Sequence, residues 1–248
     1  MKIKTITDAI EEFAPKTLAE PWDNPGLMMG SLSNECTGVV CALDLTFEVV
    51  DEALANGCNL IVTHHPFFLS AIKSIDTDES KGLLIKKVLE NGLTVYSAHT
   101  NLDECDGGLC QSLAKTLGGE NLCPNGVGVV CDIKATTLGQ FARHVASVLG
   151  DDSVKFAGDA NKKIAKMLCI CGGGAAVCKA SRGRFRDGRL QTSSVRCLAK
   201  RQFSHRGIFA LSQRDSGGRI VCKHHRSAGS ENHQIKTNLS FYDSRRIS

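Results

Sequence analysis

Hydrophobic and polar residues alternate in blocks through the first half of the chain. Short apolar runs, typical of buried strands, are each followed by a segment whose apolar residues recur at the spacing of one helix face. The predicted strands are 38–43, 59–63 and 93–98, and the predicted helices are 47–56, 83–91 and 108–117. Strands that alternate with helices in this way are typical of βα units, so we expect an α/β fold with a mostly parallel sheet.

A second, smaller group of elements follows the turn at Pro124. The predicted strands are 127–133, 154–157 and 164–171, and the helix between the first two has an apolar face of Leu138, Phe141, Val145, Val148 and Leu149. The chain is therefore expected to form an α/β lobe over residues 1–122 and a smaller α/β lobe over residues 123–176. The glycines at 172–174 are expected to form a tight turn rather than a phosphate-binding loop, because the lysine of a P-loop is missing.

Residues 177–248 differ from the rest of the chain in charge and in pattern. Residues 1–176 hold 14 Lys and Arg against 22 Asp and Glu, a net charge of −8, whereas residues 177–248 hold 16 against 4, a net charge of +12. The second segment is rich in Arg and Ser and shows neither helix nor strand periodicity. Its composition indicates disorder or a sequence of separate origin.

The composition also limits the compartment. The first residues lack the apolar run of a signal peptide, and no stretch approaches the roughly 20 apolar residues that span a bilayer. Twelve cysteines are scattered along the chain without a Cys-x-x-Cys pair. A chain of this length folds without disulfides, so we interpret the cysteines as reduced thiols of a cytoplasmic protein with no membrane segment.

The candidate chemistry lies where two predicted strands end. His64 and His65 directly follow the strand 59–63, and a segment carrying His99 and Asp103 leaves the strand 93–98 in the same way. Carboxyl ends of parallel strands are where open α/β sheets place ligands. Adjacent histidines share one site only if the backbone turns, which Pro66 favours. Two imidazoles and a carboxylate suit zinc, iron or manganese, so His64, His65 and Asp103 are the candidate metal ligands.

Simpler interpretations of these residues stay open. An adjacent histidine pair is more often a surface or structural feature than a pair of ligands. Asp103 or Asn101 is equally suited to capping the next helix, and Asp44, at the end of the strand 38–43, has the same ambiguity. Trp22, the only tryptophan, is explained as well by packing as by stacking on a substrate.

Five segments in this order and spacing resemble the NGG-interacting-factor-three-like family, whose members are often labelled GTP cyclohydrolase 1 type 2 homologues. They are Trp22-Asp-Asn-Pro-Gly-Leu27, Asp44-Leu-Thr46, Thr63-His-His-Pro66, Ala98-His-Thr-Asn-Leu-Asp103 and Gly172-Gly-Gly174. The resemblance covers residues 1–176. It implies a dinuclear metal centre with His64, His65 and Asp103 among its ligands, two divalent ions per subunit, and a toroidal homo-hexamer.

The chain departs from that family after residue 176. The family pattern continues with a late histidine followed, four residues on, by a glutamate, and the two complete its metal site. The late histidines of this chain are His205, His224, His225 and His233, and none has an acidic residue at the fourth following position. A shift of reading frame in the gene would explain both the missing ligands and the change in composition, and the nucleotide sequence around codon 176 tests it.

Three functions follow from these observations. The first is a metal-dependent hydrolase that acts on a nucleotide-like or phosphorylated small molecule, with the metal activating water. The second is a non-catalytic metal-binding or scaffold protein that lacks the C-terminal ligands. The third, a nucleic-acid arm formed by the basic tail, is disfavoured because the tail has no interleaved aromatic residues and no recognisable motif.

Overall fold

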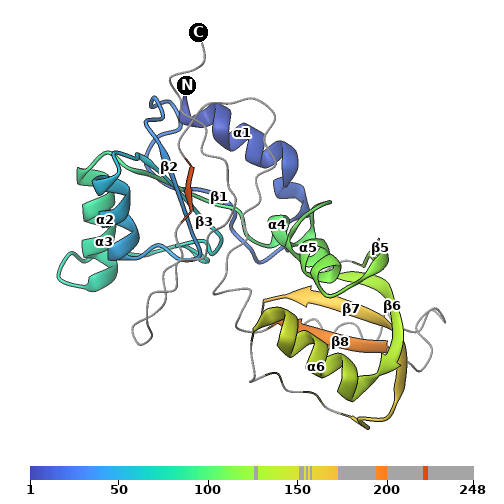
Figure 1. Cartoon of the computed structure of the whole chain (residues 1–248). Helices are drawn as coiled ribbons and strands as arrows, with labels where there is room; N and C mark the ends of the chain where they lie inside the picture. The colour runs from blue at the N-terminus through green and yellow to red at the C-terminus, as the bar shows by residue number, and fades with distance from the viewer. Residues whose placement is uncertain are drawn as a thin grey trace. The chain divides into compact units, whose positions relative to one another are not determined.

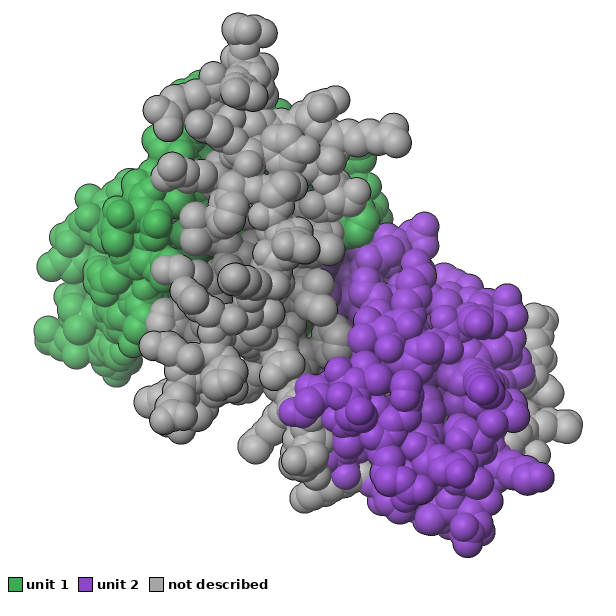
Figure 2. All heavy atoms as spheres, in the orientation of Figure 1, with its two compact units in different colours: residues 1–101, 207–248 green, residues 102–206 purple. Residues whose placement is uncertain are grey.

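The computed structural model describes residues 1–125, 128–150, 154, 156 and 158–172, together with the backbone of two strands at 194–199 and 220–222. The chain divides into two compact units, which are residues 1–101 with 207–248 and residues 102–206 (Figure 2). Each is described by itself. Among the described residues, no helix is long and apolar enough to cross a membrane.

The first unit is built on a five-stranded sheet with the order β1-β4-β3-β2-β9. Its centre consists of β2 (Val39–Ala42), β3 (Leu60–Thr63) and β4 (Thr94–Ser97), which are parallel and buried along their whole length. Such continuous burial is typical of parallel strands covered on both faces. The strand β1 (Gly26–Met29) pairs antiparallel with β4, and β9 (Ile220–Cys222) pairs parallel with β2 (Figure 1).

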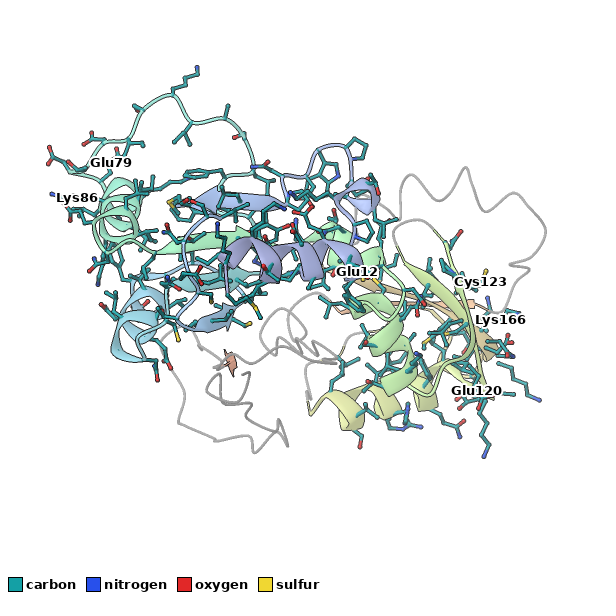
Figure 3. All side chains as sticks on the ribbon, turned by 90° about the horizontal axis from the view of Figure 1, so that it is seen from above. Glu12, Glu79, Lys86, Glu120, Cys123 and Lys166 are labelled. Carbon is teal, nitrogen blue, oxygen red and sulfur yellow. The ribbon has the colours of Figure 1, made fainter. Side chains whose placement is uncertain are left out.

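Helices precede the first strand of this sheet and connect its later ones. They are α1 (Ile3–Phe13), the short 3-10 helix η1 (Lys16–Leu18), α2 (Phe47–Ala55) and α3 (Ser80–Glu90). The α2 and α3 helices pack side by side and contribute buried aliphatic side chains to the same core as the sheet. On α3, Ile85 and Val88 are buried, whereas Lys86 is exposed and Glu79, just before the helix, lies outward with it (Figure 3). This separation is the amphipathic pattern from which the helix was predicted.

The second unit holds a four-stranded sheet with the order β5-β6-β7-β8. Its strands are β5 (Glu120–Pro124), β6 (Val129–Thr137), β7 (Lys163–Cys171) and β8 (Ser194–Ala199), and only the last pair is parallel. The helices of this unit are α5 (Leu109–Thr116) and α6 (Leu138–Leu149). The short helix α4 (Thr100–Glu104) spans the division between the units.

The α6 helix shows how local sequence sets its bounds. A capping box between Thr137 and Gln140 begins the helix, and Gly150, in the left-handed conformation with φ +62°, ends it. The predicted apolar face is confirmed for Leu138, Phe141 and Val145, which are buried, whereas Val148 of the same predicted face is exposed.

The mixed α/β fold confirms the predicted class, and two details differ. The edge strands β1 and β5 were not predicted because neither shows a regular alternation of hydrophobic and polar residues. The strand predicted at 154–157 is wrong at Val154 and Phe156, which belong to no strand, and the other two residues lie outside the described part. Gly172 lies in the predicted turn, with φ +69°.

The basic segment 177–248 contains β8 and β9, although its sequence shows no strand periodicity. The predicted disorder of the remaining residues falls outside the described part of the chain, and so do the four late histidines. The lobes 1–122, 123–176 and 177–248 stay a prediction about domain organisation.

Candidate metal centre

The candidate site begins where β3 and β4 end. These strands pair in register, with Thr63 opposite Ser97 and their hydroxyl oxygens 2.7 Å apart. Beyond Thr63 the chain bends, and the backbone amides of His64 and His65 donate to the carbonyls of Ala42 and Leu43 at 3.1 and 2.9 Å. The turn that two adjacent histidines require to share a site is therefore present, and the sheet holds it in place.

Three imidazoles converge at this edge of the first unit. The ring centroids of His64 and His65 lie 5.1 Å apart, and the ring of His99 lies 5.0 Å from the first and 5.5 Å from the second. One ligand nitrogen of each ring lies within 4.8 Å of the other two. Within the described residues, this is the one cluster of at least three histidine, cysteine or carboxylate side chains arranged to hold a metal ion.

The burial of His64 fixes its protonation state. Only 8% of the residue is exposed, and Nδ1 lies 3.0 Å from the carbonyl oxygen of Ala98. A carbonyl can only accept, so Nδ1 carries the proton and Nε2 presents the lone pair that a metal requires. Burial, together with the neighbouring His99 and His65, lowers the pKa of His64 to about 3. His64 is therefore neutral at physiological pH, which is the ligand form of imidazole.

The other two histidines are oriented by carboxylates. Nδ1 of His65 lies 2.7 Å from Oδ1 of Asp44, and Nδ1 of His99 lies 2.8 Å from Oδ1 of Asp23. In each pair the ring nitrogen donates to the carboxylate, so Nε2 again presents the lone pair. A carboxylate that holds the far nitrogen of a ligating imidazole is the usual supporting arrangement in metal sites.

Asp23 is the most constrained of these supporting groups. Its side chain is inaccessible to solvent, and Oδ2 accepts from the backbone amide and the hydroxyl of Thr100 at 3.0 and 2.5 Å. Burial raises the pKa of Asp23, but the hydrogen bonds from His99 and Thr100 outweigh that effect and hold the pKa below its usual value. The carboxylate is therefore ionised, and through its hydrogen bond with His99 it would stabilise a cation bound to that imidazole.

Substitution of Asp23 by asparagine is expected to lower metal affinity by about 10- to 100-fold, the usual effect of losing a supporting carboxylate. Asp44→Asn is expected to act in the same direction but less strongly, because Asp44 is 55% exposed and water can replace it. Calorimetric titration of metal-free protein with Zn²⁺ measures both. The control is Asp132→Asn, whose carboxylate pairs with Lys166 in the second unit. An affinity unchanged by Asp23→Asn would show that the pair with His99 plays no part in binding.

The structure places the residues considered from sequence in three ways: in the imidazole cluster, in hydrogen-bonding contact with it, or on α4. The structure brings His64 and His65 together and adds His99, which the sequence placed nearby but not among the ligands. Asp44 supports His65, and the Asn101 side chain bonds the backbone of His99 and Ala14 rather than the first turn of the next helix. Asp103 stands on α4, with Oδ1 shielded from solvent. Its role as a ligand stays a prediction.

His99 could have been found from strand register. His65 and His99 each lie two residues beyond the paired ends Thr63 and Ser97, so they occupy equivalent positions on neighbouring parallel strands. That equivalence depends on the exact end and pairing of each strand, which a hydrophobic pattern does not fix to the residue.

The sequence profile of the Duf34/NIF3 family (NGG1p interacting factor 3) matches residues 1–184. A GTP cyclohydrolase 1 type 2 homolog of Clostridium acetobutylicum is 34% identical over 198 residues, which cover 75% of this chain and 74% of the relative. A protein of the same name from Clostridium perfringens is 36% identical over 184 residues, 70% of each chain.

Two solved structures are similar over most of the chain. Reduced HcgD from Methanocaldococcus jannaschii is 32% identical, with a TM-score of 0.60 over 74% of this chain and 75% of that one. A Bacillus cereus protein related to NIF3 has a TM-score of 0.69 over 83% of this chain and 85% of that one. At 22% identity, the second similarity concerns the fold alone.

Proposed function

This chain belongs to the Duf34/NIF3 family, and from that premise we propose that it is a metal-dependent hydrolase with its metal centre on His64, His65 and His99. One observation carries the proposal. Each of the three converging imidazoles has Nδ1 held by an acceptor, so each is set to offer Nε2 to an ion.

The donor set fits zinc, iron or manganese. Imidazole nitrogens suit these ions, whereas magnesium prefers oxygen ligands and keeps its water. Three protein ligands are the usual number in catalytic zinc sites, where a further position stays open, while structural sites are closed by four. A divalent ion held here would supply Lewis-acid polarisation of a substrate oxygen and activation of water.

A second ion is part of the proposal. Asp103 remains the proposed carboxylate ligand, because a carboxylate is able to bridge two ions roughly 3.5–4 Å apart. It stands one helical turn after Thr100 on α4, the helix that directly follows His99. A ratio of two ions per chain that falls in Asp103→Asn, with binding at the histidines retained, would support this assignment.

The proposed substrate is a nucleotide-like or phosphorylated small molecule. The support is the name of the two clostridial relatives, GTP cyclohydrolase 1 type 2 homolog, together with a metal centre suited to hydrolysis. A homo-hexamer and a cytoplasmic location belong to the same proposal. Sedimentation velocity of the full chain tests the first of these.

A non-catalytic metal-binding or scaffold role is the alternative. It is favoured because the described residues bring together three imidazoles, enough for one ion, whereas a two-metal hydrolase uses more donors. Incubation of the zinc-, iron- and manganese-loaded full chain with a panel of nucleotides and phosphate esters separates the two functions. Turnover that depends on bound metal supports the hydrolase, whereas stoichiometric metal without turnover of any compound supports the scaffold.

A further inference from the structure

The histidine cluster has an exposed aromatic neighbour. Trp22 is the only tryptophan of the chain, and 56% of it is exposed. Its ring centroid lies 5.9 Å from that of His99 in an edge-to-face arrangement with an interplanar angle of 76°. More than half of Trp22 is therefore accessible to solvent, whereas Tyr96 in the same unit is 1% exposed.

The turn that carries Trp22 is fixed at both ends. The amide of Asp23 donates to the carbonyl of Glu20 at 2.9 Å and closes the turn, and the amide of Glu20 donates to Oγ1 of Thr100 at 2.9 Å. The Asp23 carboxylate binds His99 and Thr100 from the other end. The backbone that presents the indole is therefore fixed before any ligand arrives, so a ligand that contacts it loses little binding energy to ordering.

A hydrogen bond from Asn24 connects the same segment to the loop that follows the histidine pair. Nδ2 of Asn24 donates to the carbonyl of Phe68 at 2.6 Å. The Trp22 turn is thus joined to the loop after β3 through Phe68, to the loop after β4 through His99 and to the start of α4 through Thr100. The two loops supply the three imidazoles, so hydrogen bonds connect the segment that carries the indole to both parts of the cluster.

We propose that Trp22 is a stacking platform for a planar heteroaromatic ring in the molecule that binds at the histidine cluster. An indole offers a large flat surface with few torsional degrees of freedom, and nucleic-acid bases stack on such surfaces in proteins. The proposal rests on the function proposed above for the presence of a metal-bound ligand. It adds the class of that ligand and the residue that selects it.

The single tryptophan provides a direct measurement. Zn²⁺-loaded full-length protein is titrated with guanosine 5′-monophosphate and, in parallel, with ribose 5-phosphate, which has the phosphate but lacks the base. Tryptophan fluorescence is followed with excitation at the red edge of the indole band. Saturable quenching by the nucleotide and none by the sugar phosphate is the expected result, because only the base is able to stack on the indole.

Two variants separate stacking from other effects. In Trp22→Ala, calorimetric affinity for guanosine 5′-monophosphate is expected to fall about tenfold, within the usual range for one base–aromatic contact. Trp22→Phe, which keeps a smaller ring, is expected to recover part of the loss. Affinity for Zn²⁺ and for ribose 5-phosphate should not change in either variant. Phe156→Ala, which removes an exposed aromatic side chain in the second unit, is the matched control.

Equal nucleotide affinity in wild type and Trp22→Ala would overturn the proposal, and so would a failure of Zn²⁺-loaded protein to bind the nucleotide at all. A fluorescence change that follows protein concentration rather than nucleotide would also overturn it, because self-association would then cover the indole. Failure of the wild type to bind Zn²⁺ would instead count against the proposed metal centre. Metal analysis of the same samples detects that case separately.

Discussion

Substitution of His64 by alanine is expected to lower metal affinity by more than about 100-fold, above the range seen when only a supporting residue is lost. His64 is the most buried imidazole of the cluster, and its Nδ1 is fixed on the carbonyl of Ala98. Its removal therefore takes away an ordered ligand that water does not readily replace. Metal content of purified protein, together with calorimetric titration of the metal-free form, measures the effect.

Because His64 is buried, its substitution could also disturb folding, and His65→Ala provides the second variant. The His65 side chain is 39% exposed, so its removal leaves the core of the first unit intact. We expect an affinity loss in the same direction with an unchanged far-ultraviolet circular dichroism spectrum. His144→Ala, in the second unit, is the histidine control. Full metal content in both cluster variants would exclude these histidines as ligands.

Substitution of Gly30 by alanine is expected to reduce the free energy of unfolding by about 3 kcal/mol or more, from backbone strain and overpacking together. Gly30 follows β1 with φ +91°, a conformation that side chains disfavour. A Cβ atom there would lie 2.5 Å from the carbonyl oxygen of Leu93 and 2.7 Å from Cα of Thr94. Both contacts are to backbone at the start of β4, so relief requires the strand to move.

Gly57→Ala is the matched control for Gly30→Ala. Gly57 also has positive φ, at +65°, but no atom lies within 4 Å of an added Cβ. Its substitution should cost only the conformational penalty of roughly 1–2 kcal/mol. Urea denaturation followed by circular dichroism measures both variants. Equal losses would show that conformation alone, and not the close approach of β1 to β4, sets the requirement for glycine at position 30.

The sequence predicted the central strands and the helices well because the burial of each is visible as a local hydrophobic pattern, continuous in the strands and periodic in the helices. The β2, β3 and β4 strands are buried along their whole length, and α2, α3 and α6 each have an apolar face, so their patterns are visible in the sequence alone. The edge strands β1 and β5 were missed for the corresponding reason. Pairing with a neighbour, rather than an apolar pattern, makes these residues extended.

The candidate site, too, could be predicted from the sequence only in part. Local sequence was enough to place the histidine pair at a strand end, because Pro66, directly after the pair, favours an end of the strand there. The third imidazole and its partner could not be predicted with the same certainty. His99 and Asp23 are 76 residues apart in the chain, and only the folded loops bring their side chains within 2.8 Å.

The sequence alone therefore determined the fold class and the end of the sheet at which the candidate site lies, since both follow from local hydrophobic pattern and chain order. The tertiary structure decided which side chains meet. It added His99 to His64 and His65, paired each ring with an acceptor that selects its tautomer, and fixed Trp22 beside the cluster while leaving it exposed. Those relations depend on strand register and on long-range hydrogen bonds, which exist only once the chain has folded.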